Sequence, residues 1–140
     1  MKRLFFIFSA MFLFSFSGIA STKTIKVIVD GFKETKGKLM IGIYNSASTF
    51  MKKTYEGYAA YVTDTTIEFS LELPEGEYAI AVYHDANDNN KLDKGPFGIP
   101  TESYGFSNNV KGFMGAPSFK KAKFSVTDDS TVLRINLFSH

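Results

Sequence analysis

An Asx-rich segment contains the side chains best suited to chemistry in this sequence. If Asp85 is position one, the spacing places side-chain oxygens at positions one, three, five and nine, and a backbone carbonyl at position seven. A calcium ion prefers about six to eight oxygen ligands, and this spacing curls a short loop around it. The segment therefore predicts a calcium site. The predicted ligands are Asp85, Asn87, Asn89, Lys91 through its carbonyl, and Asp93.

The same segment departs from an EF-hand loop, and the departures predict weak binding. Asn90 stands at position six, where glycine is usual, and Pro96 stands at position twelve, where a bidentate glutamate is usual. Glu102 is available as a replacement ligand. Mutual repulsion among the three aspartates of the segment favours a bound cation. The alternative is an Asx-rich turn held by its own side-chain to backbone hydrogen bonds, with no ion.

Aromatic rings and side-chain amides follow this segment in a combination that suits recognition of a sugar or a peptide. A ring covers an apolar face of the ligand, while an amide bonds to a hydroxyl or a backbone group. This predicts a binding module whose partner is an envelope protein or a glycan. The alternative is a purely structural accessory domain without metal, in which these residues anchor the segment and hold turns. The predicted ligand-binding residues are Glu102, Tyr104, Phe106, Asn108 and Asn109.

A hydrolase needs a nucleophile, a base and an orienting acid, and the sequence offers few candidates. A triad would use His84 as the base and Asp85 as the orienting acid, with Ser103 or Ser107 as the nucleophile. The sequence contains no Gly-x-Ser-x-Gly elbow and no indication of an oxyanion hole. We therefore expect a non-catalytic protein, with a hydrolase that uses His84 as the minor alternative.

Period-two alternation of apolar residues predicts the strands that position these segments. No ten-residue stretch has a helical period. The pattern predicts an all-β fold, an antiparallel two-sheet β-sandwich of about seven strands with an immunoglobulin-like outline. Four aromatic residues between residues 85 and 118 favour one long ordered loop packed on the sandwich. The predicted strands are residues 24–31, 38–44, 58–63, 66–73, 77–84, 122–126 and 131–137.

Three local predictions accompany this arrangement. The Asp64-Thr65 pair predicts a hairpin between residues 58–63 and 66–73. Residues 48–56 are the only stretch expected to form a short helix. The lysines near residues 120–123 are expected on a solvated strand face, where lysine discourages aggregation between sheets.

The first 20 residues have the layout of a secretory signal peptide. Lys2 and Arg3 precede an apolar run, and Gly18 and Ala20 are the small residues of a cleavage site. A run of about thirteen apolar residues is shorter than the roughly 20 that span a bilayer. The predicted organisation is a signal peptide over residues 1–20 and one β-sandwich domain over residues 21–140. We expect a periplasmic or secreted protein with no transmembrane segment in the mature chain.

Composition excludes several classes of function. Hydrophobic residues make up 44% of the 140 residues, which excludes a disordered or solvating tract. Removal of Lys2 and Arg3 reduces the 16 basic residues to 14, equal to the 14 acidic residues. A mature chain of zero net charge has no global field to attract nucleic acid. The absence of cysteine excludes disulfides, thiol catalysis and thiolate metal sites.

Four motifs together resemble the bacterial secreted "domain of unknown function 2141" family over about residues 24–138. The motifs are HDANDNNKLD at residues 84–93, FGIP at 97–100, YGFSNN at 104–109 and GAPSF at 115–119. Val110-Lys111 and Ala116 depart mildly from the family pattern. The resemblance implies an exported β-sandwich similar in outline to prealbumin-like or carboxypeptidase-regulatory domains, and it implies no activity.

The leader generates the first testable prediction. Protein isolated from cells that produce the full chain should begin at Ser21 and lie outside the cytoplasm, because a signal peptidase cuts after small residues. Mass spectrometry of the N-terminal peptide measures this. An intact Met1 on a membrane-embedded product would contradict it.

Overall fold

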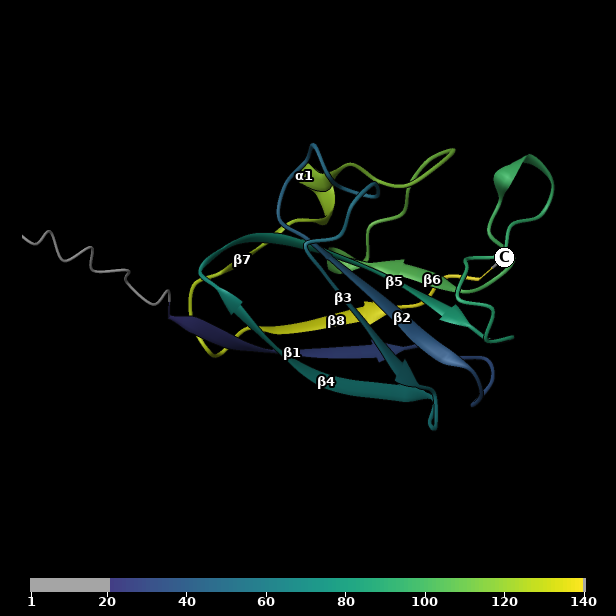
Figure 1. Ribbon diagram of the computed structural model, residues 1–140, viewed down its shortest axis with the longest axis horizontal. Helices are drawn as coiled ribbons and strands as arrows, with labels where there is room; N and C mark the ends of the chain where they lie inside the picture. The colour runs from purple at the N-terminus through teal and green to yellow at the C-terminus, as the bar shows by residue number, and fades with distance from the viewer. Residues whose placement is uncertain (1–20, 140) are drawn as a thin grey trace, which may run out of the picture.

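The computed structural model describes residues 21–139, which form two β-sheets packed face to face (Figure 1). The predicted signal peptide lies outside the described residues. Within residues 21–139, no helix is long and apolar enough to span a bilayer. The eight strands are β1 (Thr22–Asp30), β2 (Lys38–Tyr44), β3 (Glu56–Tyr61), β4 (Thr66–Pro74), β5 (Gly76–Asp85), β6 (Tyr104–Phe106), β7 (Phe124–Val126) and β8 (Val132–Asn136).

The two sheets confirm the predicted all-β sandwich. One sheet has three strands in the order β4-β1-β8, and the other has five, with the path β3-β2-β5-β6 and β7 paired to the start of β5. The structure has one strand more than the seven predicted. This additional strand, β6, lies in the segment that was expected to be a loop. Antiparallel pairing is not complete, because β1 and β8 run parallel. The chain enters β8 from β7 in the other sheet, so no hairpin reverses its direction relative to β1.

The predicted hairpin at Asp64-Thr65 is wrong. The Asp64 carboxylate accepts a hydrogen bond of 2.6 Å from the Thr65 N–H, but the strands on either side belong to different sheets. Strand β3 pairs with β2, and strand β4 pairs with β1. Alternation specifies which face of a strand is buried and leaves its partner open, so a local turn signal did not identify the neighbours.

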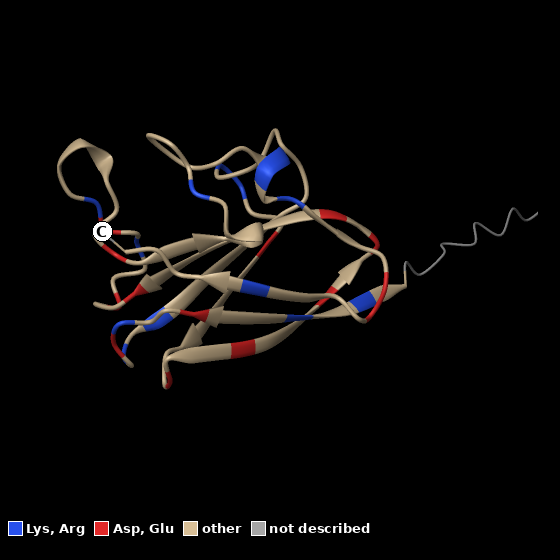
Figure 2. Ribbon diagram, turned by 180° about the vertical axis from the view of Figure 1, so that it is seen from behind, with Lys and Arg blue, Asp and Glu red and all other residues tan. Residues whose placement is uncertain are grey.

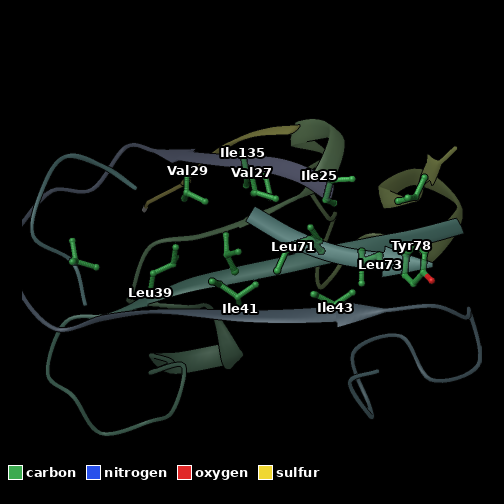
Figure 3. Packing of buried hydrophobic residues seen from close by; sticks show 14 of the residues in the cluster. Ile25, Val27, Val29, Leu39, Ile41, Ile43, Leu71, Leu73, Tyr78 and Ile135 are labelled. Carbon is green, nitrogen blue, oxygen red and sulfur yellow. The ribbon is translucent and has the colours of Figure 1, made fainter. Parts of the chain in front are cut away.

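The core lies between the two sheets and consists of the inward side chains of nearly every strand (Figure 3). Three consecutive inward positions of β1 and two of β2 are fully buried. Burying one such side chain stabilises the fold by roughly 1.5–3 kcal/mol. The labelled core residues in Figure 3 are Ile25, Val27, Val29, Leu39, Ile41, Ile43, Leu71, Leu73, Tyr78 and Ile135.

A second, smaller cluster covers one end of the outer face of the five-stranded sheet. It joins Tyr44, Phe50, Phe106 and Ala122. Ala122 belongs to the short helix α1 (Phe119–Ala122), so Lys120 and Lys121 lie on a helix and the predicted strand face is wrong there.

The helix expected over residues 48–56 is also absent, because residues 47–52 form turns. The ring of Phe50 is buried in the second cluster. Met51 has a φ of 59°, a left-handed conformation that ends a right-handed helix. Tertiary anchoring of one aromatic side chain therefore overrides a weak helical propensity.

The long segment of residues 85–118 is ordered, but it packs on the sandwich only in part. Tyr104 and Phe106 pack in the second cluster, whereas Phe97 and Phe113, the other two aromatic residues behind the prediction, project into solvent. Tyr104 and Phe138 exchange backbone hydrogen bonds of 3.0 and 2.6 Å, which hold β6 beside the C-terminal end of the chain. Two short 3-10 turns, η1 (Pro96–Gly98) and η2 (Ser107–Asn109), complete the segment.

The core generates a stability prediction. Leu73→Ala should lower the free energy of unfolding by about 2–5 kcal/mol, because it leaves a cavity at a fully buried position. Val132→Ala is the control at an exposed position on β8 and should change it by less than about 0.5 kcal/mol. Denaturant unfolding measures both, and equal effects would contradict the described core.

Candidate functional site

A groove of about 810 Å³ crosses the outer face of the five-stranded sheet. Its floor consists of small residues, because four outward positions on three neighbouring strands are glycine or alanine. Gly42 pairs with Gly57 on β3 and with Ala81 on β5, and Ala59 pairs with Met40. Larger side chains at these positions would fill the trough. The sheet therefore presents a shallow floor, and the side chains of Tyr44 and Thr54 pack over Gly42 at one end of it.

Tyrosine and methionine side chains form the walls of this groove. Tyr44 and Met51 line it near the 47–52 turns, and Tyr83 and Tyr104 line it from β5 and β6. The Tyr104 ring packs edge-on against Phe106, with the ring centroids 5.9 Å apart. This places two of the predicted ligand-binding residues, Tyr104 and Phe106, in the groove lining.

Two of the wall tyrosines, Tyr44 and Tyr83, keep their phenolic protons at neutral pH. Burial raises the pKa of Tyr44 above its usual value. Burial also raises the pKa of Tyr83, and the negative charges of Asp85 and Glu102 raise it further. Both phenols are therefore neutral groups that donate one hydrogen bond and accept others.

The Asx-rich segment forms one end of the groove. Asn90, Lys91, Leu92 and Lys94 line the groove there. Asp85, at the end of β5, is fully buried. Its carboxylate accepts hydrogen bonds from the N–H groups of Asn89, at 3.0 Å, and Asn90, at 2.7 Å. This side chain folds the segment back on the sheet and so positions the end wall.

Three of the predicted calcium ligands, Asn87, Asn89 and Asp93, contact one another. The side-chain amide of Asn87 donates to the Asp93 carboxylate at 2.6 Å, and that of Asn89 donates to both Asp93 oxygens at 3.0 Å. The amide oxygens of these two asparagines accept the N–H groups of Asn89 and Lys91, at 3.2 and 2.9 Å. The segment therefore gathers three of the four predicted side-chain ligands, and it holds them by the side-chain to backbone bonds of the alternative Asx-rich turn.

Repulsion among the aspartates of this segment was one reason to predict a bound cation. In the structure, groups of the protein itself reduce that repulsion. Lys38 forms an ion pair of 2.6 Å with Asp88, and this hydrogen bond is the main cause of the raised pKa of Lys38. Asp85 and Asp93 are bonded to N–H groups as described above. Among residues 21–139, no three His, Cys, Asp or Glu side chains form a group able to hold a metal. A cation here would therefore have fewer than three such side chains as ligands, and amide and carbonyl oxygens would have to complete its shell.

Glu102 holds both ends of the Asx-rich segment. Its carboxylate accepts the Ala86 N–H at 3.1 Å and the Asp93 N–H at 3.0 Å. The backbone carbonyl of Asp93 in turn accepts the Thr101 N–H at 2.9 Å. Glu102 does not line the groove, and these contacts make it a clamp on the segment.

The two predicted asparagines lie on η2 and bind backbone groups outside the groove. Asn108 donates to the carbonyls of Lys121 and Lys123 at 3.1 and 2.8 Å. Asn109 donates to the Arg134 carbonyl at 3.1 Å and accepts the Asn136 N–H at 2.7 Å. They join η2 to the end of α1 and to β8.

The residues considered for a hydrolase are held apart by other contacts. The His84 ring is buried, with Nε2 2.7 Å from the Lys36 carbonyl and its edge against Phe32. The Ser107 hydroxyl is fully buried and bonds the Ala122 carbonyl at 2.5 Å and the Ile80 N–H at 2.9 Å. Between His84 and Ser103 there is a backbone hydrogen bond, in which the His84 N–H donates to the Ser103 carbonyl at 2.8 Å.

The groove floor was not found by sequence reasoning. The signal for it was present, since Gly42, Gly57, Ala59 and Ala81 occupy the outward positions of the alternation. Outward small residues on one strand are unremarkable, and only strand pairing brings four of them together. The groove floor forms because β3, β2 and β5 are neighbours in the sheet.

Comparison with known proteins identifies one family. The family model described as "uncharacterized protein conserved in bacteria (DUF2141)" matches residues 27–134. No curated protein and no solved structure matches the chain.

The clamp generates a prediction. Glu102→Gln replaces one accepting oxygen with an NH₂ group, which cannot accept a hydrogen bond. It should lower the free energy that holds the segment closed by about 1–3 kcal/mol. Hydrogen exchange at Ala86 and Asp93 should accelerate accordingly. Glu72→Gln, at an exposed position on β4, is the control and should leave these amides unchanged. Unaltered exchange in Glu102→Gln would contradict the clamp.

Proposed function

The chain belongs to the DUF2141 family of bacterial proteins, and on this premise we propose that it is an exported, non-catalytic binding domain of the cell envelope whose outer groove takes a glycan. The observation that carries this proposal is the floor of glycine and alanine between tyrosine walls. Export rests on the leader, and the absence of catalysis rests on the enclosed environment of His84 and Ser107.

The chemistry of the groove suits a sugar. A pyranose ring has an apolar face that stacks on an aromatic ring and an edge of hydroxyls that needs donors and acceptors. The floor lets a flat ring approach the sheet closely. Tyr83 and Tyr104 supply rings, while Asn90, Lys91 and Lys94 supply polar groups at one end. Apolar walls with a few polar groups are typical of small-molecule sites.

Filling the floor tests this function. Ala59 is exposed and lines the groove, so Ala59→Leu should block a ligand without disturbing the core. The parent protein is first screened against a panel of bacterial surface glycans. The affinity of Ala59→Leu for an oligosaccharide that binds the parent should be lower by at least about tenfold, or about 1.4 kcal/mol. Isothermal titration measures the change.

Ala47→Leu is the matched control, because Ala47 is exposed and does not line the groove. It should bind as the parent does. No binding to the panel at millimolar sugar, or equal binding by Ala59→Leu, would contradict a glycan in the groove.

We also propose that the Asx-rich segment takes a weak calcium ion. The convergence of Asn87, Asn89 and Asp93 side chains favours this second function. Rotation of the two side-chain amides by 180° would present their oxygens, in place of their NH₂ groups, to the Asp93 carboxylate. Oxygens facing a carboxylate need a cation between them. The hydrogen bond from the Asn89 N–H to Asp85 is kept in that arrangement, and only the bonds made by the two side-chain amides change.

A thermal melt tests the calcium proposal. A dissociation constant on the order of 10⁻⁴ to 10⁻³ M is expected, since the amide bonds compete with the ion and no bidentate glutamate is present. At a tenfold excess over that constant, calcium should stabilise the fold by about 1.4 kcal/mol and raise Tm by a few degrees relative to chelator. Magnesium should do less, because it demands octahedral geometry.

Asp93→Asn should abolish the calcium effect, because it removes a charge from the proposed shell. Asp88→Asn removes a charge from the same segment, but Asp88 pairs with Lys38 and lies outside the shell, so this variant should respond as the parent does. A parent melt that millimolar calcium leaves unmoved would show that the segment is a turn without an ion.

A further inference from the structure

Two loops carry large apolar side chains at their tips in full contact with solvent. Phe97 is 99% exposed, and Phe113 and Met114 are each 93% exposed. They lie on the loops of residues 94–100 and 111–116. Both loops rise on the outer side of the five-stranded sheet, the side that holds the groove (Figure 1). Isolated exposed apolar residues are common, but three at near-complete exposure on two neighbouring projections need an explanation.

The backbone holds these tips outward. The 94–100 loop is closed by a hydrogen bond of 2.8 Å from Gly95 N–H to the Ile99 carbonyl, and Phe97 at its tip has a φ of 63°. In the other loop Met114 has a φ of 54°. A left-handed conformation is unusual for bulky residues. Both tips are therefore displayed by defined turns.

The turn of the 111–116 loop depends on Gly112. A Cβ there would lie 1.6 Å from the Gly115 carbonyl oxygen, so only glycine fits. This crossing brings the two ends of the loop together and leaves Phe113 and Met114 at its apex.

Positive charge surrounds the tips. Residues 94–126 contain five lysines and one glutamate, and Lys123 among these lysines forms an ion pair with Glu77 on β5. The glutamate, Glu102, is bonded to two backbone amides. Lys94 and Lys111 lie at the start of the two loops, and Lys120 and Lys121 lie exposed on α1. Figure 2 shows basic segments on both loops and on α1, with acidic segments beside the base of one loop. Apolar tips with a basic surround are complementary to an anionic, partly apolar surface.

We propose that this tip face, Phe97 and Phe113-Met114 with their flanking lysines, docks on an anionic lipid bilayer. Separate aromatic tips insert between headgroups without needing a matching pocket, and lysines near the surface attract acidic lipids. A protein partner needs a contiguous, complementary patch of about 1,000 Å², which two separate projections do not supply. Docking would turn the groove toward the membrane, and it does not depend on what the groove binds.

Vesicle sedimentation tests the docking. Protein isolated from cells that produce the full chain should bind phosphatidylglycerol–phosphatidylcholine vesicles, and phosphatidylcholine vesicles much more weakly. The triple variant Phe97→Ser, Phe113→Ser and Met114→Ser should lose at least about tenfold in partition, because apolar burial at the interface is removed. Val132→Ser, at an exposed position in the other sheet, should bind as the parent does.

The charge contribution is tested separately. Replacing Lys111, Lys120 and Lys121 with Gln should weaken partition by about fivefold for each lysine on anionic vesicles. The matched control replaces three lysines at the other sheet and its adjoining loop, Lys26, Lys33 and Lys36, and should have little effect.

A site-specific reporter is available because the chain has no tryptophan. The emission of Phe97→Trp should shift to the blue on anionic vesicles and be quenched by brominated lipid, whereas Val132→Trp should remain unchanged. Circular dichroism confirms that each variant is folded.

Three results would overturn the proposal. These are equal binding by the triple serine variant, equal binding to neutral and anionic vesicles, and a Phe97→Trp emission that vesicles leave unshifted. Self-association that the triple variant abolishes, without vesicle binding, would assign the tips to a second copy of the chain. Ala59→Leu should retain vesicle binding, which separates this test from that of the glycan groove.

Discussion

Alternation along β5 is the constraint on which the rest of the molecule depends. Its inward residues Tyr78, Ile80 and Val82 are buried in the core, while its outward residues Ala81 and Tyr83 face the groove. β5 pairs with β2, β6 and β7, so its register sets theirs. A slip of one residue would exchange the two faces of the strand. Core packing and groove shape are thus fixed by one strand.

The same strand ends in Asp85, and this position links the sheet to the Asx-rich segment. A buried carboxylate is costly unless its oxygens are bonded, and here two backbone N–H groups fill that role. Glu102 accepts two further backbone N–H groups, and Asp93 accepts the side-chain amides of Asn87 and Asn89. The segment is therefore closed by the protein's own donors, and an ion would have to compete with them. This accounts for a defined end wall in a chain without disulfides.

The outer face combines two kinds of surface that differ in physical character. The groove is recessed because Gly57, Ala59 and Ala81 carry small or no side chains on the outward face. The loop tips project because glycine turns and left-handed residues push large side chains into solvent. Basic residues lie between these features and on α1, whereas the glutamates of β4 lie on the opposite sheet. The proposed contacts all fall on the outer face of the five-stranded sheet.

The sequence by itself determined the all-β class, the buried face of each main strand and the Asx-rich turn, because alternation and Asx turns involve residues only a few positions apart. Strand β2 occupies residues 38–44, as its pattern predicted. Only the tertiary structure decided which strands pair, that residues 104–106 form a strand, and that small residues from three strands share a floor. The ion pair of Arg134 with Asp30 joins residues 104 positions apart in the sequence, and the paired residues of β1 and β8 are separated by a similar number of positions. Such contacts depend on packing of the whole chain, and no local pattern of residues encodes them.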